Sequence, residues 1–267
     1  IESLPATSQP HDLQVVDYND AEALTQAAAG CEIAVHLVGI IRESENTTYT
    51  QAHEDTCAAL TTAARNAGLK HIIYLSIFGA DSESPNACLA SKGRAEDLLL
   101  ASAIRTTILR IPMVLGPGDP STLGLMRQAR ARLVPLVSGG STLQQPIDCR
   151  DVVAAVLAAI GQHRNDDQRL DLGGPECLSH SALIARTARA LGRKPPAIFS
   201  IPMAPTRFII RTLNRLLAQA PITLAMFEVL QHDDQIDPAP ACRALGIPLL
   251  PLDDTLHYCV SEESFSK

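Results

Sequence analysis

The hydroxyl of Ser76, the thiol of Cys88 and the ammonium of Lys92 are the groups whose types and spacing could do chemistry. Ser76 ends the run 72–75, which is short, apolar and free of charge, as a strand buried on both faces requires. Lys92 falls early in the helix that follows, with Cys88 one turn before it. Ligands of open α/β sheets bind at the carboxyl ends of the strands, so Ser76 and Lys92 are predicted to meet in a binding site.

Strands and helices alternate through the first half of the chain and would position these groups. Gly30 and Gly68 end two of the helices, as C-terminal glycines commonly do. The predicted strands are Leu13–Val16, Ile33–Val38, His71–Ser76 and Thr106–Ile111, and the predicted helices are Ala21–Ala29, Thr48–Ala67 and Cys88–Ser102. This alternation indicates parallel strands joined by right-handed crossovers, and hence an α/β fold with a doubly wound, Rossmann-like sheet.

The second half is less regular and predicts a small, mostly helical C-terminal lobe. Asp151 is expected to cap a helix that ends near Ile160, and short helical pieces separated by prolines are expected beyond Pro195–Pro196. We therefore predict a sheet domain over residues 1–115 and a lobe over residues 116–267, from which one strand at about 169–172 returns to the sheet.

The composition of the chain indicates which kinds of partner and which cellular compartment to expect. The net charge of −7 argues against nucleic acid as a partner, because phosphate binding needs a clustered basic face. No apolar run approaches the roughly 20 residues that span a bilayer, and the first residues show no signal peptide, so a cytoplasmic protein is expected. The cysteines are scattered without a C-x-x-C pair, which predicts reduced core residues and no metal site.

Four further features each have more than one interpretation. His36 is expected to be a core or edge histidine rather than a catalyst, and His53 a residue of a helix surface. The run His232–Asp234 is assigned to a solvated turn rather than to a metal site. Arg207–Leu217 carries arginine at every fourth position among apolar residues. That pattern predicts a helix that binds a protein complex or a membrane surface, or one packed on its own lobe.

Several short motifs together resemble a known family. They are His36–Gly39, Tyr74–Asp81, Ser91–Lys92, Ile108–Arg110, Gly116–Asp119, Gln145–Asp148 and Asp171–Glu176. In this order and spacing they resemble the extended, atypical short-chain dehydrogenase/reductases. The branch that they resemble most contains the nucleotide-binding accessory subunit of respiratory complex I and its bacterial relatives.

The resemblance implies a role for each matching residue, and NAD or NADP as the ligand. It implies that Ser76 supplies the active-site hydroxyl and that Lys92 binds the nicotinamide ribose. The other cofactor-binding residues that it implies are Asp17 and Tyr18 at the adenine, Val38 and Gly39 under the ribose and phosphates, Leu75 beside Ser76, and Pro112, Met113 and Val114 beside the carboxamide.

Two departures from the family pattern bear on activity. Cys88 stands where the family has its general acid/base tyrosine, and its shorter side chain would miss the substrate oxygen. The strand and G-x-x-G-x-x-G loop that open the family's fold, and bind its pyrophosphate, are also absent. We therefore expect a fragment, truncated at its N-terminus, that binds NAD(P) weakly or not at all. The choice between NAD and NADP stays open.

Three functions follow as alternatives. The first is an NAD(P)-binding accessory or assembly protein, cytoplasmic or peripheral to the inner membrane, with little conventional catalysis. The second is an NAD(P)-dependent oxidoreductase, epimerase or isomerase on a small or isoprenoid-type substrate, with Ser76, Lys92 and Cys88 as its catalytic candidates. The third is an NAD(P) redox sensor.

Overall fold

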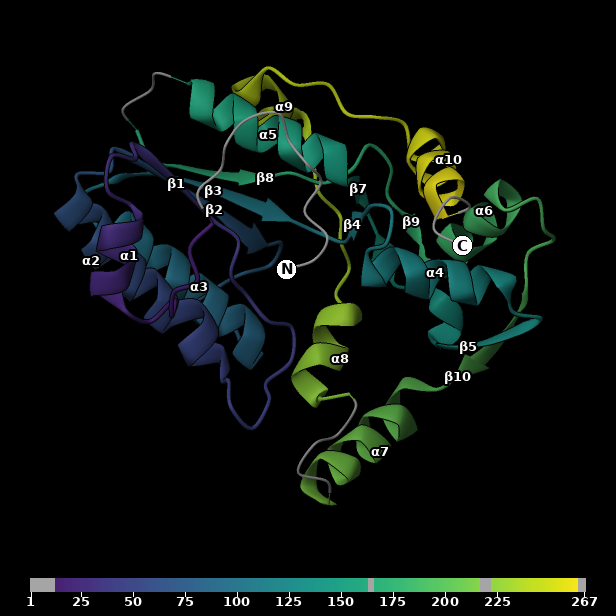
Figure 1. Cartoon of the computed structure of the whole chain (residues 1–267). Coiled ribbons are helices and arrows are strands. Elements are labelled where there is room, and N and C mark those ends of the chain that lie inside the picture. Colours follow the sequence, from purple (N-terminus) through teal and green to yellow (C-terminus); the bar gives the residue numbers. More distant parts are fainter. Residues whose placement is uncertain (1–12, 163–165, 217–221, 264–267) are drawn as a thin grey trace.

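The computed structural model describes residues 13–162, 166–216 and 222–263 (Figure 1). At its centre is a parallel sheet with strand order β1-β2-β3-β8. Its strands are β1 (Ile33–His36), β2 (His71–Ile77), β3 (Arg105–Ile111) and β8 (Gln168–Asp171). Because the strands are parallel, their carboxyl ends meet at one edge, and the predicted doubly wound sheet is confirmed.

The middle strand β2 is buried on both faces, as its uncharged sequence predicted. Ile72 and Tyr74 pack beneath the helices of one face, and Ile73 packs against Leu109 and Ile147 on the other. Side chains alternate along a strand, so Ser76 shares the face of Tyr74, and Ile77 shares the face of Ile73.

Helices cover both faces of the sheet (Figure 1). One face carries α1 (Ala21–Ala27), α2 (Thr56–Ala67), which continues the π-helical turn η1 (Thr50–Asp55), and α3 (Ala87–Leu100). The other carries α5 (Cys149–Gly161) and α9 (Ala239–Leu245). Asn86 caps α3 through the backbone N–H groups of Cys88 and Leu89. Asp148, rather than the predicted Asp151, caps α5.

The C-terminal lobe is mostly helical, as predicted, but it also contains short strands. Its helices are α4 (Pro120–Arg130), α6 (His180–Ala190), α7 (Met203–Leu216), α8 (Leu224–Leu230) and α10 (Leu252–Glu263), with the 3₁₀ turn η2 (Ser138–Gly140). Its strand pairs are β4 (Val114–Leu115) with β7 (Ile147–Asp148), β5 (Leu133–Val137) with β10 (Ala197–Ile201), and β6 (Leu143–Gln144) with β9 (Leu178–Ser179). The helical pieces expected beyond Pro195–Pro196 form as α7, α8, α9 and α10, but the short strand β10, directly after these prolines, was not predicted. The domain division near residue 115 stays a prediction.

The predicted strand Leu13–Val16 does not form. These residues follow an irregular path, and the Val15 side chain is 84% exposed. A strand requires a hydrogen-bonded neighbour, and within the described residues β1 pairs only with β2. The outer edge of β1 is therefore unpaired among the described residues, and Leu13–Val16 does not pair with it.

The described residues also bear on two predictions from composition. Among them, no helix combines the length and apolarity needed to cross a membrane. All seven cysteines are free, and Cys57, Cys88 and Cys259 are buried. Cys31 and Cys177 are exposed, so the expectation that the cysteines belong to the core fails for these two.

Candidate functional site

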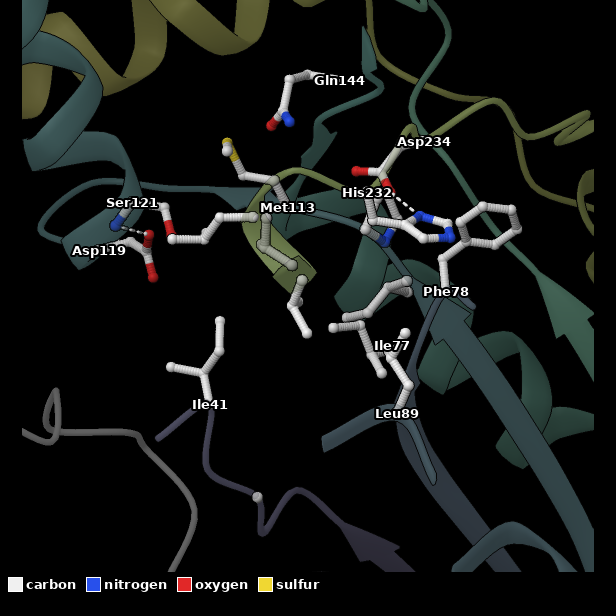
Figure 2. Close-up of a pocket in the computed structure, with 16 residues that line it drawn as sticks. Ile41, Ile77, Phe78, Leu89, Met113, Asp119, Ser121, Gln144, His232 and Asp234 are labelled. Carbon is white, nitrogen blue, oxygen red and sulfur yellow. Dashed lines mark hydrogen bonds and ion pairs between the residues drawn. The ribbon is translucent and has the colours of Figure 1, made fainter. Parts of the chain in front are cut away.

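A cavity of about 520 Å³ lies at the carboxyl ends of the central strands, between the sheet and the C-terminal lobe (Figure 2). Its apolar lining residues are Gly39, Ile41, Ile77, Phe78, Leu89, Ile111, Pro112, Met113, Val114, Val229 and Leu230. Its polar lining residues are Asp119, Ser121, Gln144, His232 and Asp234. A mainly apolar pocket with a few polar groups is the usual form of a small-molecule site.

Separate elements bring this lining together. Strands β2 and β3 end at the cavity floor, with Ile77 and Ile111 as their last residues. Asp119 is held in place because its carboxylate caps α4, accepting the Ser121 N–H at 2.7 Å. Helix α8 closes the cavity from the C-terminal lobe through Val229 and Leu230. A ligand bound in this cavity would therefore contact both the sheet and the C-terminal lobe.

Lys92 belongs to α3, and its side chain is buried between this helix and β2. Its ammonium donates hydrogen bonds to the Tyr74 hydroxyl at 2.9 Å and to the Leu75 carbonyl at 3.3 Å. Burial lowers the pKa of Lys92 to about 8. A Cβ placed on Gly39 would lie 2.9 Å from the Lys92 Nζ, so a larger residue at this position would displace the ammonium.

Cys88 does not face the cavity as an acid or base. Its side chain is 2% exposed, and its sulfur lies 3.8 Å from the Ile40 carbonyl oxygen. Burial raises the pKa of the Cys88 thiol to about 11, although Lys92 opposes that shift. The next residue, Leu89, lines the cavity in its place.

Ser76 is tied into a buried ionic network rather than exposed to the cavity. Its hydroxyl donates to the Glu96 carboxylate at 2.6 Å. The same carboxylate accepts hydrogen bonds from Arg110, the shortest 2.6 Å, and lies 3.1 Å from Arg169. The neighbouring Ile77, on the opposite face of β2, contributes to the cavity lining instead.

The structure divides the remaining predicted cofactor residues into three groups. Gly39, Pro112, Met113 and Val114 line the cavity. Tyr18 and Val38 line a separate hollow of about 300 Å³ beside β1. Asp17 is exposed and accepts a hydrogen bond from the Asn19 N–H, and Leu75 packs on the face of the sheet opposite Tyr74.

His53 was predicted on a helix surface, and this prediction is wrong. The side chain is fully buried at the junction of η1, α3 and the loop after β1. The Ile40 N–H donates to its Nε2 at 3.0 Å, so Nδ1 carries the proton and donates to the Ser91 hydroxyl at 2.7 Å. His53 shares a helical face with the buried Cys57 and Leu60, and that period was the sequence signal for its burial.

His232 and Asp234 lie in an irregular, partly exposed segment, as predicted, but both side chains also line the cavity, which was not predicted (Figure 2). The His232 Nδ1 lies 3.6 Å from the Asp234 carboxylate, which raises the pKa of the imidazole. Its ring meets Phe78 edge-on, with centroids 5.8 Å apart. Gly79, at φ +82°, leaves room for this ring, because a Cβ there would lie 3.2 Å from it. No local sequence pattern predicts the contact between His232 and Phe78, because the two residues lie far apart in the chain and His232 follows α8.

The cavity and the Lys92 environment fit part of a nicotinamide dinucleotide. Gly39 keeps the strand end open beside the buried ammonium, and Pro112–Val114 provide backbone along the cavity wall. Within the described residues, however, no glycine-rich turn opens a helix at this edge to bind a pyrophosphate. The described residues therefore suit the nicotinamide end better than the phosphates.

A doubly wound parallel sheet with a cavity across its strand ends defines a dinucleotide-binding α/β protein of the Rossmann type. The sequence model of an NAD(P)H-binding family matches residues 2–164, and the chain belongs to that family.

Two relatives of known name show that similar chains occur in different kinds of protein. The mitochondrial NADH dehydrogenase (ubiquinone) 1 alpha subcomplex subunit 9 of Arabidopsis thaliana is 24% identical over 223 residues, which is 81% of this chain and 54% of that protein. The ceramide reductase of Caulobacter vibrioides is 32% identical over 143 residues, which is 53% of this chain and 44% of that protein. The chain thus spans about half the length of these relatives.

Solved structures support the same fold. MoeE5, determined with UDP-glucuronic acid and NAD, superposes with a TM-score of 0.71 at 19% identity, covering 93% of this chain and 85% of that chain. At that identity the likeness establishes the fold alone. The predicted resemblance to NAD(P)-binding proteins with a Rossmann-type fold is confirmed.

Proposed function

We propose that this protein is an NAD(P)-binding, atypical short-chain dehydrogenase/reductase with an accessory or assembly role and little conventional catalysis. The observation that carries the proposal is the Cys88 thiol, which is buried, directed at the Ile40 carbonyl and held protonated by a pKa of about 11. Such a group cannot exchange a proton with a substrate in the cavity. The dinucleotide would then support structure rather than turnover.

The proposal assigns the dinucleotide to the strand ends. Lys92 would hold the nicotinamide ribose, with Gly39 and Pro112–Val114 around it, while Asp17 and Tyr18 would meet the adenine. When bound, a nicotinamide supplies hydride transfer. Binding by this chain would be weak or absent, because the described residues lack a turn for the pyrophosphate. Its setting would be cytoplasmic and peripheral to the inner membrane, as part of a larger complex; the complex-subunit name of the Arabidopsis relative supports this role.

Calorimetric titration with NADPH and NADH, followed by an NADPH oxidation assay with carbonyl substrates, tests this proposal. We expect affinity weaker than micromolar and no turnover, for both the natural chain and Cys88→Ala. Micromolar affinity would contradict the expected weak binding. Turnover that Cys88→Ala abolishes would overturn the proposal and assign proton transfer to the thiol.

A second candidate is an NAD(P)-dependent oxidoreductase or epimerase on a small or isoprenoid-type substrate. The His232–Asp234 pair favours it, because an imidazole beside a carboxylate is a common general acid/base and this one lines a mainly apolar cavity. Turnover that survives Cys88→Ala but falls at least about 100-fold in His232→Gln would support this candidate.

A further inference from the structure

Helix α7 has an amphipathic surface that the rest of the chain leaves open. Figure 1 shows α7 beyond α8, at the end of the molecule away from α5 and α9. Of its side chains only Ile210 is buried, and Phe208 and Leu216 are 71% and 75% exposed. The predicted segment Arg207–Leu217 coincides with this helix, except that Leu217 lies outside the described residues.

The exposed apolar residues of α7, here called the apolar arc, lie on one face of the helix, which also contains the exposed Thr212. At about 100° per residue they fall within an arc of roughly 140°. The apolar arc consists of Phe208, Ile209, Leu213 and Leu216, all exposed. Exposed apolar residues gathered on one helix mark an interaction surface rather than scattered surface residues.

Positive charge flanks the apolar arc on one side. Arg211 and Arg215 are exposed next to Phe208, and within the described residues neither forms an ion pair. Arg207 differs from these two residues, because its guanidinium forms an ion pair with Glu228 at 2.5 Å. No aspartate or glutamate occurs in Met203–Leu216, although the whole chain carries a net charge of −7. The local charge is thus opposite to the overall charge.

We propose that α7 lies in the surface of an anionic phospholipid bilayer, with the apolar arc among the acyl chains and Arg211 and Arg215 at the phosphates. An amphipathic helix with an apolar face and flanking basic residues suits that position, because apolar burial and attraction to anionic lipid act together. The charge complementarity favours lipid phosphates over an apolar protein groove, which would not need the arginines. This deepens the proposed peripheral setting and rests on it.

The helix is coupled to the rest of the molecule through α8. The Glu228 carboxylate that pairs with Arg207 also accepts a hydrogen bond from Asn86 at 3.4 Å, and Asn86 caps α3. Asn214 of α7 accepts the Leu224 N–H at 3.1 Å, joining α7 to the start of α8. Since α8 also lines the cavity, a bilayer under α7 would lie next to the element that closes the cavity.

Vesicle flotation of the full chain tests the inference. Vesicles of phosphatidylcholine alone are compared with vesicles that also contain phosphatidylglycerol, at about 0.1 M and 0.5 M salt. We expect binding only to the anionic vesicles, and weaker binding at high salt. Arg211→Gln with Arg215→Gln should weaken binding about 30-fold, and Phe208→Ser with Ile209→Ser at least about 10-fold.

The matched control is Arg189→Gln with Arg193→Gln, which removes the same charge from exposed arginines elsewhere and should leave flotation unchanged. Circular dichroism melts confirm that each variant folds. Equal binding to neutral vesicles, equal loss in the control, or no flotation at all would overturn the inference, and in the last case the apolar arc would be assigned to a protein partner. NADPH titration of the same variants reports separately on the proposed function.

Discussion

The ammonium of Lys92 lies 2.9 Å from the phenol oxygen of Tyr74, and both groups are buried beneath α3. The family that the sequence resembles pairs this lysine with a tyrosine one helical turn earlier, where this chain has Cys88. Here the tyrosine comes instead from the middle strand of the sheet. Burial raises the pKa of Tyr74, so its phenol stays protonated and stabilises the lysine rather than serving a substrate.

Tyr74→Phe should therefore destabilise the protein by about 1–3 kcal/mol. The ring still fills its place, but the buried ammonium loses one of its two acceptors. Urea unfolding measures the change, and Tyr18→Phe, at an exposed tyrosine, is the control and should change little. Equal stability of Tyr74→Phe and the natural chain would show that the hydrogen bond contributes nothing.

Ser76→Ala should cost about 2 kcal/mol of stability and leave dinucleotide affinity unchanged. The hydroxyl donates to the buried Glu96 carboxylate and is not part of the cavity lining. Ser121→Ala, at an exposed cavity residue, should leave stability unchanged. The opposite result for Ser76→Ala, unaltered stability with affinity for NADPH lowered more than about 10-fold, would place this hydroxyl in the site and favour the catalytic role that the resemblance implies.

Acid should destabilise the protein between about pH 6.5 and pH 4. Burial lowers the pKa values of His36, His53 and His71 to about 4, below the ordinary 6.5. In this window the unfolded chain binds protons that the folded chain does not, so stability rises with pH and falls on acidification. Each of these histidines contributes up to about 1.4 kcal/mol per pH unit. Urea unfolding at successive pH values checks this, and a flat profile from pH 7 to pH 5 would contradict it.

Gly93→Ala should unfold the chain or destabilise it by about 3 kcal/mol. A Cβ at Gly93 would lie 2.2 Å from the Ser82 nitrogen and 2.3 Å from the Asp81 carbonyl carbon, and backbone cannot move aside as a side chain can. Gly124→Ala is the matched control in α4, where a Cβ meets nothing within 4 Å. That substitution should stabilise the helix by about 0.5–1 kcal/mol. Thermal melts of the two variants should therefore shift in opposite directions.

The local sequence determined most of the secondary structure of the first half. The uncharged, β-branched run of β2 can satisfy its backbone only inside a covered sheet, and Gly68 stops α2 at φ +75°. The family resemblance placed Lys92, Gly39 and Pro112–Val114 near one strand edge because motif spacing follows the order of the strands.

Only the tertiary structure decided which of these groups face the cavity. Because side chains alternate along β2, Ser76 points towards Glu96 and Ile77 lines the cavity. A shift of one residue along the strand would exchange the two faces of the sheet on which these side chains lie. His232 and Asp234 reach the site because α8 folds back over the strand ends. The strand predicted at Leu13 did not form, and within the described residues the outer edge of β1 has no strand partner. Such contacts join segments far apart in the chain, so no local pattern contains them.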